Sequence, residues 1–199
     1  MVPAASPARS ALLRRGFALE YATLAWNVAG IVVLASAAIS ARSVALAGFG
    51  LDSLIEIGAS TVVIWELSGA GEERQRRGLR LIGYAFAALA VYLLVQSTVV
   101  LATGYHPRPS ALGMAWTAVT AAAMFALAWG KARTGRALGN PVLRTEGRVT
   151  MIDGILAVAV LLGLALNGAL GWWWADPAAG YVLVGYAGHE VREIFFPRH

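Results

Sequence analysis

The sequence is poor in two kinds of residue, cysteine and charged residues. It has no cysteine, which excludes disulfides and thiolate metal sites and leaves the redox compartment open. Only 14% of its 199 residues are charged, whereas 58% are hydrophobic and the mean hydropathy is +0.64. Average soluble domains carry about 25% charged residues, so we expect lipid, not water, to surround most of this chain.

Motifs of hydrolytic enzymes are also absent. Neither His-Glu-x-x-His nor Gly-x-Ser-x-Gly occurs. The stretch from Gly48 to Asp52 superficially resembles the Gly-x-Gly-Asp motif of intramembrane aspartic proteases, but Leu51 separates the glycine from the acid. One extra residue turns a helical side chain by about 100°. We therefore predict that the protein is not an enzyme.

What the sequence does have is apolar stretches long enough to cross a bilayer, which takes about 20 residues. There are six of them: 17–39, 44–66, 79–102, 111–130, 149–170 and 174–195. We predict an all-α polytopic membrane protein with six transmembrane helices. Its parts would be a cytoplasmic N-terminal tail (1–16), a transmembrane domain (17–195) and a short C-terminal tail (196–199). The first stretch is interpreted as a retained span and not a signal peptide, because it is long and contains Asn27.

The basic residues predict how the chain is oriented. Fourteen of them precede the first span, follow the last, or lie between spans two and three or four and five, against only Arg42 and Arg108 on the other side. Since Lys and Arg accumulate in cytoplasmic loops, both termini are predicted to be cytoplasmic and the membrane to be the inner one. The clusters are short and lack interleaved aromatic residues, so nucleic acid is not a predicted partner.

Three acidic residues, Asp52, Glu56 and Asp153, fall inside the apolar stretches, where each charge costs at least about 2.5 to 3.5 kcal/mol. No basic residue lies within 44–66 or 149–170, the two stretches that contain them. Together these acids must bind a cation, take up protons, or alternate between the two, which is the chemistry of a cation/proton exchanger. The alternative is that they are protonated residues that hold helices together by hydrogen bonds.

The spacing of these acids predicts a site between two helices. Asp52 and Glu56 are four residues apart and share one helix face. Glu146 and Asp153 are seven apart and also share a face, with Glu146 as an entry carboxylate on the cytoplasmic side. The predicted spans put Glu56 about 18 Å from the outer end of its helix and Asp153 about 6 Å from the inner end of its own. In a bilayer core about 30 Å thick, the two side chains would then differ in depth by about 6 Å. Helix tilt or an earlier start of the fifth helix would absorb this difference.

The segment from Ser43 to Ser60 resembles the second helix of the cation diffusion facilitators, with its acid-x-x-x-acid metal motif. In the fifth helix, where that family typically carries His-x-x-x-Asp or Asp-x-x-x-Asp, Asp153 matches the last acid and Val149 stands at the first ligand. Ala175 to Pro177, at the start of span six, is similar too. The resemblance implies export of a divalent metal ion of the Zn, Mn, Co, Fe or Cd class from the cytoplasm by proton antiport, with no permanently bound cofactor.

The sequence departs from that family in two ways. Val149 cannot bind metal, so the expected ligands are Asp52, Glu56 and Asp153, completed by Thr150, a backbone carbonyl or water. Oxygen ligands favour harder ions such as Mn²⁺ over Zn²⁺. The chain also ends soon after span six, so no cytoplasmic domain is expected, and a homodimer would form through the membrane helices. The alternative function is a non-transporting metal-binding or regulatory membrane subunit that partners a full-length relative.

Overall fold

The computed structural model describes residues 7–41, 44–69, 72–105 and 110–196, and it is all-helical over these ranges. Arg42, Arg108, and the outer parts of the predicted tails lie outside the described residues. The chain forms six helices, which are α1 (Pro7–Ala41), α2 (Val44–Leu67), α3 (Glu72–Thr103), α4 (Ala111–Leu138), α5 (Pro141–Leu170) and α6 (Ala175–Phe195). The predicted all-α fold with six helices is confirmed.

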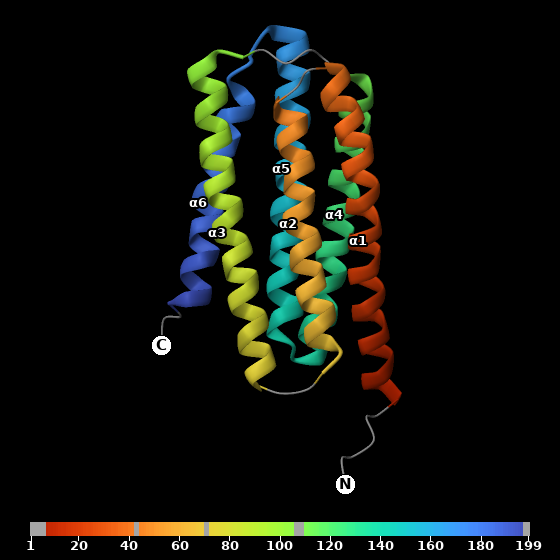
Figure 1. Cartoon of the computed structure of the whole chain (residues 1–199). Helices are drawn as coiled ribbons and strands as arrows, with labels where there is room; N and C mark the ends of the chain where they lie inside the picture. The colour runs from red at the N-terminus through yellow and green to blue at the C-terminus, as the bar shows by residue number, and fades with distance from the viewer. Residues whose placement is uncertain (1–6, 42–43, 70–71, 106–109, 197–199) are drawn as a thin grey trace.

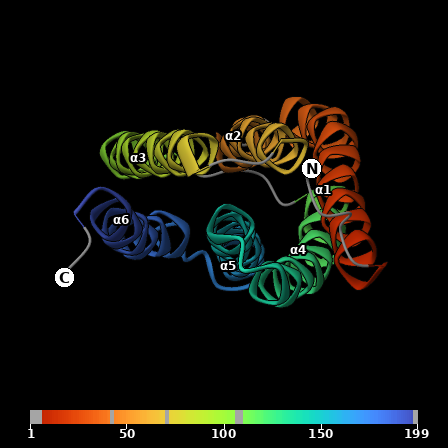
Figure 2. The same cartoon turned by 90° about the horizontal axis from the view of Figure 1, so that it is seen from below.

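The helices run alternately up and down in two layers (Figures 1 and 2). Helix α1 packs against α2 and α4, and α4 packs against α5, so that these four helices form one unit. Helices α3 and α6 pack chiefly against each other beside it. Helix α1 begins and α6 ends at the same end of the bundle (Figure 1). This is the end that the basic residues predict to be cytoplasmic.

Four of the helices, α1, α3, α4 and α5, are long and apolar enough to cross a membrane among the residues described. Helices α2 and α6 have 24 and 21 residues and lie in the same bundle. At 1.5 Å per residue, 21 residues extend about 31 Å, close to the thickness of a bilayer core. Helix α2 carries three acidic residues, Asp52, Glu56 and Glu66. The protein is a polytopic membrane protein.

The connection between α4 and α5, which is predicted to be cytoplasmic, differs from the predicted spans. Helix α4 continues to Leu138, where Gly139 ends it in a left-handed conformation (φ 64°). Helix α5 begins at Pro141, capped by Asn140, whose side-chain oxygen accepts a hydrogen bond from Leu143 N at 2.9 Å. Helix α5 therefore begins before the apolar stretch 149–170 does. This earlier start brings Asp153 to the level of the acids on α2 and removes the predicted offset.

Helices α4 and α5 also approach each other closely through glycine. A Cβ atom at Gly147 would lie 3.1 Å from the backbone N of Ala132, and one at Gly154 would lie 2.9 Å from the ring of Phe125. A side chain at Gly154 would therefore displace the ring of Phe125, and one at Gly147 would press against the backbone of α4. Helices α4 and α5 thus form a tight hairpin along much of their length.

Candidate cation site

Asp52, Glu56 and Asp153 lie together in the interior of the bundle, and we call them the central acids. Their exposed fractions are 2%, 2% and 5%. Asp52 and Glu56 project from one face of α2, and the carboxyl group of Asp153 on α5 lies within hydrogen-bonding reach of both of them. Two carboxyl groups share a hydrogen bond only when one of them carries a proton. The arrangement is therefore suited to holding protons.

The central acids have one neutral donor and two vacant acceptors. Asn27 on α1 donates its side-chain N–H to Glu56 Oε2 at 3.3 Å and to the backbone oxygen of Thr23 at 3.0 Å. Asp52 Oδ2 and Glu56 Oε1 are buried and accept no hydrogen bond from the described part of the chain. Buried acceptors of this kind are costly unless something binds them. A proton or a cation would satisfy them.

The central acids do not surround a common point. Among the described residues, no group of three or more His, Asp and Glu side chains is arranged to hold a metal ion. Asp153 instead pairs with each of the two acids on α2. Coordination of one ion by all three carboxylates would therefore need their side chains to rotate from this arrangement.

The structure places Glu146 and Thr150, the two predicted accessory residues, with Lys131 on α4. Lys131 Nζ donates to Thr150 Oγ1 at 3.0 Å and contacts the carboxylate of Glu146 directly. Thr150 Oγ1 in turn donates to Glu146 Oε2 at 3.3 Å. Val149, at the first ligand position of the family motif, is buried with an exposed fraction of 3%. A role of Glu146 and Thr150 toward metal remains a prediction.

Lys131 is the charged residue that sequence reasoning missed. Because the apolar stretch 111–130 ends directly before Lys131, the sequence predicts that this residue lies in the cytoplasmic loop between spans four and five. Lys131 is instead a residue of α4 with no exposed surface, and its Nζ lies 3.1 Å from Glu20 Oε2 on α1. Because α4 continues past residue 130, the side chain turns inward rather than toward water. One signal was available: Lys131 is the only lysine in a chain with 15 arginines.

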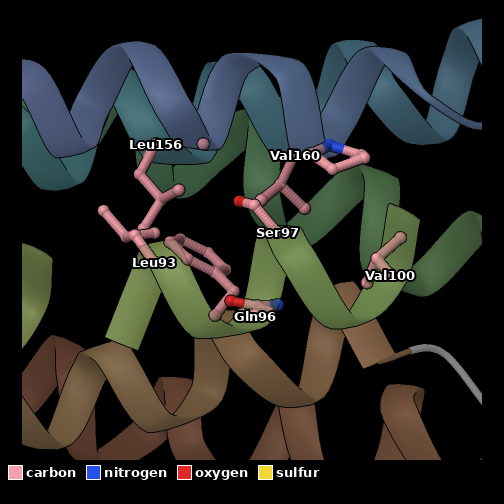
Figure 3. Close-up of a pocket in the computed structure, with 9 residues that line it drawn as sticks. Leu93, Gln96, Ser97, Val100, Leu156 and Val160 are labelled. Carbon is pink, nitrogen blue, oxygen red and sulfur yellow. The ribbon is translucent and has the colours of Figure 1, made fainter. Parts of the chain in front are cut away.

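A small pocket lies on the outer side of the central acids. Figure 3 shows residues that line it. Phe49 precedes Asp52 by about one helical turn, and Leu156 follows Asp153 by about one turn, so both lie between the acids and the outer end. The free volume is about 20 Å³, enough for about one water molecule. It is lined by residues of α2, α3, α5 and α6, which are Phe49, Leu93, Gln96, Ser97, Val100, Leu156, Val160, Pro177 and Gly180. We call it the outer pocket.

Comparison with known proteins places this arrangement in a family. The family model described as the cation efflux transmembrane domain matches residues 80–197, a range that contains Lys131, Glu146 and Asp153. The uncharacterized transporter sll1263 of Synechocystis sp. (strain ATCC 27184 / PCC 6803 / Kazusa) is 28% identical over 169 residues, which cover 76% of this chain and 54% of the relative. The chain thus spans about half the length of this curated relative. Since the family model matches more than half of the sequence, the protein belongs to the cation efflux family.

Proposed function

We propose that the protein exports a divalent transition-metal cation from the cytoplasm, across the inner membrane, in exchange for protons. The observation that carries the proposal is the meeting of Asp153 on α5 with Asp52 and Glu56 on α2 inside the bundle. Intramembrane carboxylates are expensive and mark ion or proton pathways. Membership of the cation efflux family supports a cation as the substrate.

The same carboxylates would carry both the metal ion and the protons. The hydrogen-bonded pairs around Asp153 fit the proton-loaded half of a transport cycle, in which protons reduce the repulsion between the acids. Rotation of the side chains toward Asp52 Oδ2 and Glu56 Oε1 would gather oxygen ligands for a cation and release those protons. Competition between metal and protons for one set of oxygens would couple their movements in opposite directions.

The chemistry of the donors supports an oxygen-binding substrate. The atoms with which the central acids could bind a metal ion are all carboxylate oxygens. Val149 supplies no imidazole at the position where the family motif has its first ligand. Carboxylate, carbonyl and water ligands suit Mn²⁺, whereas imidazole suits Zn²⁺. We therefore place Mn²⁺ ahead of Zn²⁺, Co²⁺, Fe²⁺ and Cd²⁺ as the transported ion. A homodimer formed through the membrane helices is part of the same proposal.

The test is metal-driven proton movement in proteoliposomes that contain the purified protein and a pH-sensitive dye. A panel of Mn²⁺, Zn²⁺, Co²⁺, Fe²⁺, Ni²⁺ and Cd²⁺ is applied to the unsubstituted protein, to Asp52→Ala and to Asp153→Asn. We expect proton movement with at least one ion, lost in both variants. The control is Glu73→Gln, which removes an exposed carboxylate of α3 that pairs with Arg77 at 2.9 Å. Unchanged transport in Asp52→Ala would refute the assignment of the site.

The second candidate function is a non-transporting membrane subunit that binds metal or a full-length relative. Two observations favour it. Among the described residues, no group of acids is arranged around one ion, and Val149 stands where the family motif has its first ligand. A purified protein that binds a full-length relative but moves none of the ions in the panel would support this function over export.

A further inference from the structure

Five buried polar residues form a charged layer across the four-helix unit, and we call it the lysine layer. It contains Glu20 of α1, Ser60 of α2, Lys131 of α4, and Glu146 and Thr150 of α5, all with no exposed surface. Lys131 Nζ contacts Glu20 at 3.1 Å, Thr150 at 3.0 Å and Glu146 directly. Ser60 Oγ donates to Glu146 Oε1 at 3.1 Å. One ammonium group thus links three helices, and a hydroxyl adds the fourth.

The lysine layer lies between the central acids and the cytoplasmic end of the bundle. Glu146 precedes Asp153 by seven residues along α5, which is about 10 Å toward the start of that helix. Ser60 follows Glu56 by four residues toward the same end of α2. The outer pocket lies on the opposite side of the central acids. At the level of the lysine layer the interior is filled by five side chains with no exposed surface.

The contacts of the layer fall into two sets. Lys131, Glu146 and Thr150 belong to the α4–α5 hairpin, whose close glycine contacts hold the two helices together. The contacts from Lys131 to Glu20 and from Ser60 to Glu146 cross from this hairpin to α1 and α2. If the hairpin moves as a unit, the crossing contacts are the ones that must break. Lys131 would keep Glu146 as its partner, which avoids an unpaired ammonium inside the membrane.

We propose that the lysine layer is the cytoplasmic gate of the transport path, with Lys131 as a positioning residue that keeps α1 and α2 against the α4–α5 hairpin. When the gate is closed, the ammonium group pairs with the carboxylates of Glu20 and Glu146, so neither of them is free to bind an entering cation. Opening separates Lys131 from Glu20 and exposes the Glu20 carboxylate to a cation from the cytoplasm. This inference rests on the proposed export function, because a gate has meaning only for a path.

The absence of cysteine permits a direct test with a single thiol reporter. Val149→Cys places the thiol at a buried position at the level of the lysine layer, next to Thr150 and about one helical turn before Asp153. Inside-out vesicles are treated with a membrane-impermeant maleimide, and the rate of modification is measured in the reporter background alone, with Glu20→Gln, and with Lys131→Gln. Arg77→Gln, which breaks an exposed pair on α3, is the matched control.

We expect both gate variants to speed modification from the cytoplasmic side by about tenfold or more, which corresponds to about 1.4 kcal/mol. Arg77→Gln should leave the rate unchanged. Because Glu20→Gln keeps Lys131 paired with Glu146, it tests the gate even if Lys131→Gln does not fold. An unchanged rate in Glu20→Gln, or an equal increase from the outer side in right-side-out vesicles, refutes the gate.

Metal transport by the cysteine-free protein is measured in parallel. The two results together distinguish failure of the gate from failure of the export function. Unchanged labelling in Glu20→Gln together with metal-driven proton movement refutes the gate alone. Faster labelling together with no cation movement by the unsubstituted protein refutes the export function and the gate with it. Faster labelling together with transport supports both.

Discussion

The bundle buries two groups of acidic side chains, and they differ in how their charge is balanced. In the lysine layer, Glu20 and Glu146 share the ammonium group of Lys131. In the central acids, the carboxyl group of Asp153 lies against two other carboxyl groups, and the side-chain donor that reaches them is the neutral amide of Asn27. The lysine layer therefore contains a cation of its own. A group of carboxyls alone depends on protons or on a cation from outside.

The largest expected effect is a loss of stability when the lysine layer loses its cation. Lys131→Met leaves two buried carboxylates without their cation, and removing one partner of a buried ion pair costs about 3 to 5 kcal/mol. Asp153→Asn removes a carboxyl from a group already linked by hydrogen bonds, and we expect a loss of about 1 kcal/mol. Thermal unfolding in detergent measures both.

The control for this prediction replaces the whole charged set. Lys131→Met combined with Glu20→Gln and Glu146→Gln removes all three charges, and we expect it to recover part of the lost stability. Equal losses in Lys131→Met and Asp153→Asn would show that the two groups are balanced in the same way.

A smaller effect is expected from adding metal ions to the purified protein. If the central acids bind a cation, an ion at about 100 times its Kd stabilises the folded protein by about 2.7 kcal/mol. The thermal midpoint should therefore rise with the transported ion, and this rise should disappear in Asp153→Asn and persist in Glu73→Gln. The same rise in Asp153→Asn would place the bound ion away from the central acids.

The smallest expected effect concerns the choice of ion. Val149→His adds an imidazole at the position where the family motif carries its first ligand, and we expect the preference for Zn²⁺ over Mn²⁺ to increase by about tenfold. Competition between the two ions in the proteoliposome assay measures it, with Val149→Ala as the control for lost volume. No change in preference would mean that residue 149 does not face the ion.

Much of the fold followed from the sequence because lipid imposes simple rules. Long apolar stretches predicted the six helices, and the cost of charge in lipid singled out Asp52, Glu56 and Asp153. Their spacing placed them on two helix faces, and the structure brings those faces together. The start of α5 could not be read from apolarity, because Asn140 and Pro141 begin the helix before the apolar stretch does.

The lysine layer was missed for a different physical reason. Hydropathy identifies which segments cross the membrane but not which faces meet, and Lys131 stands at the end of an apolar stretch like a loop residue. Its burial depends on partners far away in sequence, at Glu20 and Glu146. Pairing across helices is a property of the packed bundle and leaves no periodic pattern in any one segment.

The fact that the only lysine of the chain is also its buried ammonium has a practical consequence. Lysine labelled with ¹⁵N at Nζ would introduce one side-chain resonance into the whole protein, and it would report from inside the membrane without any substitution. The hydrogen exchange and chemical shift of that resonance would respond to its acidic neighbours as ions and protons bind. A spectroscopic probe of the bundle interior is therefore already present in the natural sequence.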